Sequence, residues 1–171
     1  MKISRAAMLG LGFLLSVPAL AAEPRCATVS DSNLPPAFST WGQPARAVAA
    51  GATAAAAARI ELDVPAEIRL LPAITPAIAP GRSRPVDNAH AGLLVVRIPG
   101  AGKWRVGLSG SAWIDVIGTD GKPVASAGHG HMAPCTTLKK VVEFDLQAGD
   151  HLIQISGNPG PALKLLVSPG S

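Results

Sequence analysis

The chain has 171 residues, and its 15 lysine and arginine residues outnumber 11 acidic ones, for a formal net charge of +4 at pH 7. It has no tyrosine, three phenylalanines and three tryptophans. Such a composition offers neither a dense basic stripe for a phosphate backbone nor a platform of rings for stacked bases. We therefore expect no nucleic-acid partner.

The first 21 residues follow the three-part pattern of a secretory signal peptide. Lys2 and Arg5 form a positive start, residues 6–17 are apolar but too few to span a bilayer, and Ala19-Leu20-Ala21 is a small-x-small cleavage site. No later run reaches the roughly 20 apolar residues that a transmembrane helix needs. We expect a periplasmic or secreted protein without a membrane span after signal cleavage.

Two cysteines, Cys26 and Cys135, remain after cleavage. In an oxidising compartment such thiols pair, so we expect a disulfide between them. The bridge closes a loop of more than a hundred residues. In the chain-entropy model a loop of that length stabilises the folded state by about 4–5 kcal/mol.

Residues 22–59 read as an Ala/Pro-rich arm that precedes the main domain. The tract ARAVAAGATAAAAAR contains helix formers without an apolar stripe, which predicts either a short surface helix or a disordered linker. Phe38 and Trp41 lie just before this tract, and two such rings are seldom left in water. We expect both to dock on the main body.

Residues 60–171 read as a β-domain. Short apolar runs recur with turn signals between them, and Asp120-Gly121 is a hairpin signal. Two runs alternate with period two and predict inward-facing Trp104, Val106, Leu108, Val142, Phe144 and Leu146. The pattern predicts an all-β fold of about eight short strands, an antiparallel β-sandwich of jelly-roll-like type.

Residues 90–168 also carry two resemblances. VVRIPGAGKWRVGL, WIDVIGTDGKPVAS and KKVVEFDLQAGDHLIQISG resemble the small β-sandwich domains appended to secreted bacterial peptidases, which implies the same fold. SAWIDVI, ASAGHGHMAPCTTLKKVVEFDL and IQISGN resemble short secreted proteobacterial proteins, some of them labelled homogentisate 1,2-dioxygenase. Enzymes with that activity hold iron with two histidines and a carboxylate. Here His129 and His131 precede Glu143, and only His151 follows it.

The segment SAGHGHMAPCTTLKK is the candidate metal site. In a strand, His129 and His131 would point to the same face and clamp one ion. Met132 and Cys135 would add sulfur ligands, a set that suits copper, with iron as the other candidate. The alternative is a glycine-rich loop between two strands, which the disulfide of Cys135 fastens to the arm without any ion.

Signals for catalysis are weaker. GLSGS lacks the second glycine of a nucleophile elbow. Ser109, His129 and Asp115 have the residue types of a catalytic triad, but residue types without geometry do not predict one. Asp115 lies in a run that reads as interior, so we expect Arg105 or Lys103 to pair with it.

The sequence therefore favours an exported, non-catalytic binding or accessory protein, without a cofactor, whose partner is an unknown protein or small molecule. The two alternatives are a copper- or iron-binding protein that uses His129, His131 and Met132, and an enzyme of the labelled dioxygenase kind.

Overall fold

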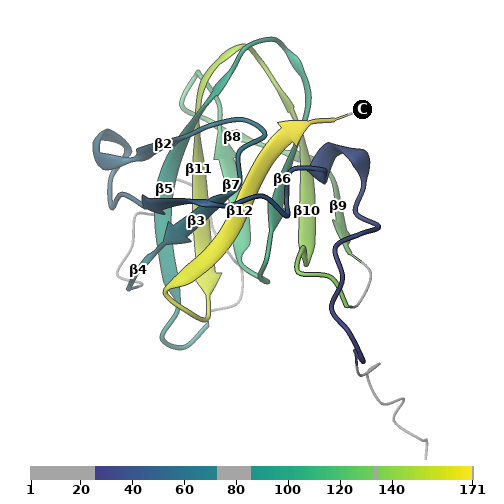
Figure 1. Cartoon of the computed structure of the whole chain (residues 1–171). Helices are drawn as coiled ribbons and strands as arrows, with labels where there is room; N and C mark the ends of the chain where they lie inside the picture. Colours follow the sequence, from purple (N-terminus) through teal and green to yellow (C-terminus); the bar gives the residue numbers. More distant parts are fainter. Residues whose placement is uncertain (1–25, 73–85, 133–134, 171) are drawn as a thin grey trace, which may run out of the picture.

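The computed structural model describes residues 26–72, 86–132 and 135–170. Within these ranges the protein is all-β, with twelve strands and two short 3-10 helices, η1 (Pro36–Phe38) and η2 (Ala54–Ala56) (Figure 1). The strands are β1 (Arg46–Ala49), β2 (Ala58–Ile60), β3 (Ala66–Arg69), β4 (Leu71–Pro72), β5 (His90–Ile98), β6 (Gly102–Leu108), β7 (Trp113–Ile117), β8 (Pro123–Val124), β9 (Ser126–His131), β10 (Lys140–Leu146), β11 (Gly149–Asn158) and β12 (Ala162–Pro169).

The strands form two sheets. Sheet A has the order β1-β3-β12-β6-β10-β9, and sheet B has the order β2-β5-β11-β7-β8, with β4 beside β5. Most neighbours are antiparallel, but β1 runs parallel to β3 and β2 runs parallel to β5. Both sheets are therefore mixed, and the expectation of a wholly antiparallel fold is wrong at these two pairs. The chain visits β2 in sheet B between β1 and β3, and this crossover lets β3 run in the same direction as β1.

The alanine-rich tract accounts for this difference. It is not one helix or a linker throughout: it supplies strands β1 and β2, and the expected short surface helix is confined to the exposed 3-10 turn η2 between them. The sheets thus begin at Arg46, inside the range expected to be an arm. Alanine has little intrinsic preference for strands, so the pairing with β3 and β5 decides the local structure.

Buried side chains of both sheets meet in one apolar cluster. It includes Ile68 and Leu165 from sheet A and Val96 and Ile153 from sheet B. The period-two alternation is confirmed, because the six side chains expected to face inward on β6 and β10 are all buried.

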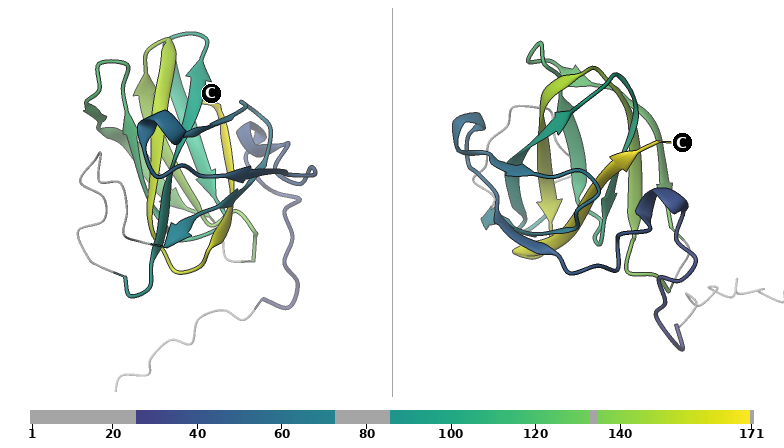
Figure 2. Two further views of the ribbon diagram at one scale, coloured as in Figure 1. Left: turned by 90° about the vertical axis from the view of Figure 1, so that its left-hand side faces the viewer. Right: turned by 45° about the horizontal axis from the view of Figure 1, so that its top comes forward.

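A second apolar cluster fastens the N-terminal segment to the outer side of sheet A. Phe38 and Trp41 are 1% and 0% exposed and pack with Leu138 and Leu166. Their rings meet edge to face at a centroid distance of 6.5 Å. In both views of Figure 2, η1 lies beside the yellow strand β12, in line with the contacts between them. The expected docking of both rings is confirmed.

Polar and covalent links hold the same segment. Cys26 and Cys135 form the expected disulfide, with their Cα atoms 5.3 Å apart. The Ser30 amide donates to the Cys135 carbonyl at 2.8 Å, and Asp31 accepts the Thr137 amide at 2.7 Å. The segment from Cys26 to Trp41 is therefore held at both ends, by the bridge and by the aromatic cluster.

Gly107 makes room for this docking, because a Cβ added there would lie 2.4 Å from Phe38 Cε1 and 2.9 Å from Leu138 Cδ1. We expect Gly107→Ala to lower the free energy of unfolding by about 1–3 kcal/mol, since the ring must shift to relieve the overlap. Urea unfolding measures the change. Gly100→Ala, where an added Cβ meets nothing within 4 Å, is the control. Equal effects of the two variants would contradict the packing described here.

The expected hairpin joins β7 and β8, which pair Ile117 with Pro123. Gly121 has a φ of +77°, a backbone conformation that side chains rarely adopt. The Asp120 carboxylate accepts the Lys122 amide at 3.1 Å. The chain then crosses directly from β8 in sheet B to β9 in sheet A, so the run expected to be one return strand is two.

Among the described residues, no helix has the length and apolar character that crossing a membrane requires.

Candidate functional site

The segment with the two neighbouring histidines is a strand. β9 pairs antiparallel with β10, with His129 opposite Val142 and His131 opposite Lys140. The two glycines of this strand have no positive φ. The expectation of a glycine-rich loop is therefore wrong, because pairing with β10 holds these glycines extended. Both histidines share the face of sheet A that carries buried Val142.

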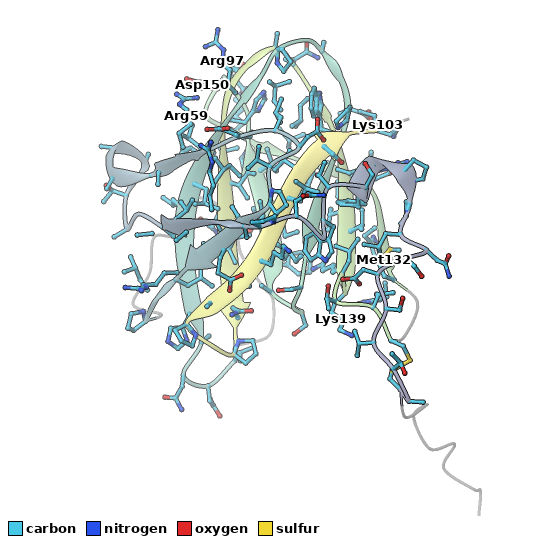
Figure 3. All side chains as sticks on the ribbon, in the orientation of Figure 1. Arg59, Arg97, Lys103, Met132, Lys139 and Asp150 are labelled. Carbon is cyan, nitrogen blue, oxygen red and sulfur yellow. A yellow bond between two sulfur atoms is a disulfide. The ribbon has the colours of Figure 1, made fainter. Side chains whose placement is uncertain are left out.

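Sulfur ligands are not available beside the histidines. Met132, labelled in Figure 3, packs against the second apolar cluster, which contains Phe38 and Trp41. Cys135 is bonded to Cys26. The proposed set of His129, His131 and Met132 is thus reduced to the two imidazoles.

Neither Glu143 nor the other two histidines complete a ligand set with this pair, although Glu143 and His129 line one open depression at β9. Glu143 lies opposite Gly128, the residue before His129. Because neighbouring residues of a strand point to opposite faces, the Glu143 side chain lies on the face of sheet A opposite the histidines. There the Arg105 guanidinium donates to it at 2.7 Å and holds the pKa of the Glu143 carboxyl below its usual range. His90 and His151 belong to strands of sheet B. In the described ranges no three or more histidine, cysteine, aspartate or glutamate side chains gather around a point that could hold a metal ion.

A small pocket opens beside β9, between the edges of the two sheets. It has a volume of about 110 Å³ and is lined by Trp113, Ile114, Ser126, His129, Lys140 and Val142. The first two residues come from β7 in sheet B, and the other four come from β9 and β10 in sheet A. Ile114 and Val142 are buried and form an apolar floor.

Trp113 and Lys140 form the polar rim of this pocket. The Trp113 side chain is 40% exposed, whereas Trp41 and Trp104 are buried. Lys140 donates to the Ala112 carbonyl at 2.9 Å, and its ammonium lies 5.2 Å from the centre of the Trp113 ring. The indole of Trp113 donates to Asp115 at 3.1 Å, which fixes the orientation of the ring.

The lining residues include two basic side chains, His129 and Lys140, and no carboxylate. Lys140 therefore attracts a negatively charged group on a bound molecule, and the Asp115 carboxylate behind the Trp113 indole offsets part of that attraction. Sequence reasoning found His129 but missed Trp113 and Lys140. The one sequence feature that points to this pocket is a tryptophan at the start of a strand. From the sequence alone, such a tryptophan can equally well be buried in the core or lie at the edge of a pocket.

Asp115 is positioned differently from the expectation. It lies on β7 in sheet B, while Lys103 and Arg105 lie on β6 in sheet A. Its partners are Trp113 and, at 3.4 Å, the side-chain amide of Gln154. The pairing with Arg105 or Lys103 is therefore wrong, since consecutive strands β6 and β7 belong to different sheets.

The structure does not bring Ser109, His129 and Asp115 together through hydrogen bonds as a catalytic triad would require. The Ser109 hydroxyl accepts the Lys164 amide at 2.8 Å, and Asp115 is engaged on β7. None of the hydrogen bonds described for these two residues leads to His129.

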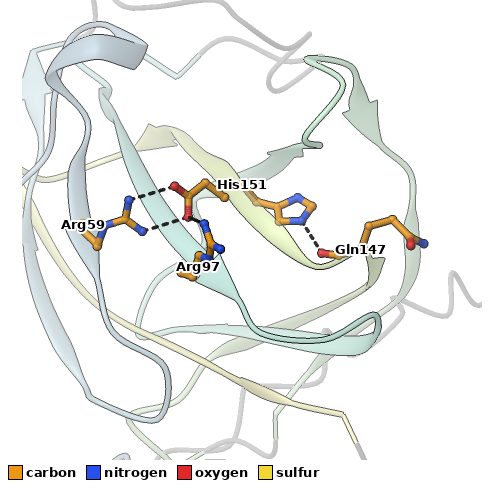
Figure 4. Close-up of polar contacts among 5 residues, drawn as sticks. Arg59, Arg97, Gln147 and His151 are labelled. Carbon is orange, nitrogen blue, oxygen red and sulfur yellow. Dashed lines mark hydrogen bonds and ion pairs between the residues drawn. The ribbon is translucent and has the colours of Figure 1, made fainter.

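A separate charge cluster lies on β2, β5 and β11 of sheet B, away from the pocket residues on β7 (Figure 4). Arg59 donates to both oxygens of Asp150 at 3.1 and 3.0 Å, and Arg97 approaches the same carboxylate at 3.5 Å. The hydrogen bonds from Arg59 hold the pKa of the Asp150 carboxyl below its usual range. The neighbouring His151 is 2% exposed and lies 2.8 Å from the Gln147 carbonyl. All three charged groups are exposed, and such surface pairs contribute little to stability.

The fold and this site define an all-β protein with a disulfide-fastened N-terminal segment and a small pocket, lined by Lys140 and His129 among others, at the edge of its two sheets. No protein-family model matches the chain, and no curated protein matches it.

Proposed function

We propose that this protein is an exported, non-catalytic binding module and that its ligand site is the pocket beside Trp113. The observation that carries the proposal is the combination, in one pocket, of an exposed indole, an apolar floor and basic groups without a carboxylate. Ligand sites typically combine apolar walls with a few oriented polar groups.

The pocket favours a small ligand with an apolar body and one carboxylate. Its volume of about 110 Å³ is below the roughly 150 Å³ of an engineered apolar cavity that binds benzene, so it suits a short alkyl chain or a single ring that is only partly inserted. Ile114 and Val142 would contact the apolar body, and Lys140 would receive the carboxylate through a charge-assisted hydrogen bond.

Export is supported by the bridge between Cys26 and Cys135, because structural disulfides persist in oxidising compartments. We place the mature protein in the periplasm or outside the cell, after removal of the signal peptide expected at residues 1–21. We also propose that the two mixed sheets form a β-sandwich with jelly-roll-like crossings, since their buried faces share one core.

Ligand binding is testable through Trp113, the most exposed of the three tryptophans. We expect benzoate or a short alkanoate to change its fluorescence, and the matching neutral alcohol to bind more weakly. Lys140→Gln is expected to weaken carboxylate binding by about 10- to 100-fold, because a hydrogen bond to a charged group contributes about 1.5–3 kcal/mol. Calorimetric titration of the variant gives the dissociation constant.

Lys139→Gln is the matched control, because Lys139 is the exposed neighbour of Lys140 in the chain and does not line the pocket. It is expected to bind carboxylates as the parent protein does. Failure of every tested carboxylate to bind, or equal affinities of parent and Lys140→Gln, would refute the proposed site.

A further inference from the structure

We propose that His129 and His131 together bind one divalent transition-metal ion, with Cu²⁺ bound more tightly than Zn²⁺. The first support is geometric. Both residues lie on β9 with one glycine between them and in unbroken register with β10. Successive residues of a strand advance by about 3.3 Å, so these two side chains leave the same face about 7 Å apart, within reach of one ion.

Access is the second support. Both histidines are exposed, and β9 is the edge strand of sheet A. An ion can therefore approach the two imidazoles from solvent, without opening the core.

The chemistry of the available donors sets the choice of metal. Met132 is packed against the second apolar cluster and Cys135 is in the disulfide, so sulfur donors are absent from the pair. Two imidazoles suit Cu²⁺ and Zn²⁺, and the usual affinity order places Cu²⁺ first. Two nitrogen ligands leave the remaining coordination positions to water or to an external ligand.

Lys140 opposes metal binding, so removing its charge should affect metal binding and carboxylate binding in opposite directions. It lies opposite His131 in the ladder and lines the same pocket as His129. Its ammonium repels a metal cation, although the Ala112 carbonyl and the Trp113 ring hold it on one side. Removing the charge should therefore strengthen metal binding while it weakens carboxylate binding.

The experiment is a calorimetric titration of the untagged, disulfide-bonded protein with Cu²⁺ and with Zn²⁺ in a non-chelating buffer. We expect one ion per chain. His129→Ala and His131→Ala should each weaken binding about tenfold or more, because each removes one arm of a chelate. Lys140→Gln should tighten binding several-fold.

His90→Ala is the matched control, because it removes a histidine on β5 of sheet B and should leave the affinity unchanged. Circular dichroism of each variant confirms that it is folded. The proposal is overturned if neither ion binds, or if His131→Ala binds as tightly as the parent protein. His131 does not line the pocket, so its loss tests the metal site without removing a side chain from the carboxylate site.

Discussion

Replacing both Cys26 and Cys135 with serine is expected to lower the free energy of unfolding by about 4–5 kcal/mol. The bridge joins residues 109 positions apart, so it removes a large part of the conformational entropy of the unfolded chain. Urea unfolding of parent and double variant, both followed by circular dichroism, measures the difference. The parent protein measured in reductant should approach the double variant.

The loss should also be visible locally. Without the bridge, the start of the N-terminal segment is held by the hydrogen bonds of Ser30 and Asp31 to residues around Cys135. Amide hydrogen exchange is therefore expected to rise first at residues 26–31, ahead of the segment near Trp41. A double variant as stable as the parent, with unchanged exchange there, would show that the bridge does not fasten this segment.

The second large effect is expected at the aromatic cluster. Trp41→Ala should lower the free energy of unfolding by about 3–5 kcal/mol, because it empties a fully buried site. Trp41 is 0% exposed and packs on Phe38. Its indole donates to the Thr137 hydroxyl at 2.7 Å, and the Lys164 ammonium lies 5.2 Å from its ring. Both contacts are lost along with the packing.

Trp113→Ala provides the matched control for this change, since it removes the same side chain from a site that is 40% exposed. It should lower the free energy of unfolding by about 1 kcal/mol or less, as expected for a partly exposed site outside the core. Comparable losses in the two variants would be incompatible with a buried Trp41 and an exposed Trp113. Trp113→Ala should at the same time weaken carboxylate binding.

Several structural features could be predicted from the sequence, because they depend on a local hydrophobic pattern, on cysteine pairing or on the size of an apolar side chain. Alternation along β6 and β10 placed Trp104 and Phe144 inward, as the structure shows. The signal peptide expected at residues 1–21, together with the two remaining cysteines, predicted the disulfide that the structure contains. The size of the Phe38 and Trp41 rings predicted that they would be buried.

Other features depend on which strands become neighbours, and a single sequence does not encode that in a local pattern. The expected partner of Asp115 came from the strand next in the chain, but β6 and β7 are in different sheets. The alanine tract became strands through pairing with β3 and β5. The strand character of β9 likewise depends on β10, since glycine and histidine have no strong preference for strands.

The pocket illustrates the same limit. Trp113 and Ile114 come from one sheet, while His129 and Lys140 come from the other, so only tertiary structure brings them together. Met132 is a residue that the sequence placed in a site to which it does not belong. Because it follows His131 directly in the sequence, a shared metal site was expected. Successive residues of an extended chain point to opposite faces, and Met132 joined the aromatic cluster instead.

Nuclear magnetic resonance with a ligand such as benzoate tests most directly whether the pocket beside Trp113 binds a small carboxylate. Each of the three tryptophan side chains contributes one indole N–H signal. Ligand binding is expected to shift the signal of Trp113 and the ring signals of His129, while the signals of buried Trp41 and Trp104 stay in place. Shifts confined to Trp41 or Trp104, or no shift at saturating ligand, would contradict the account.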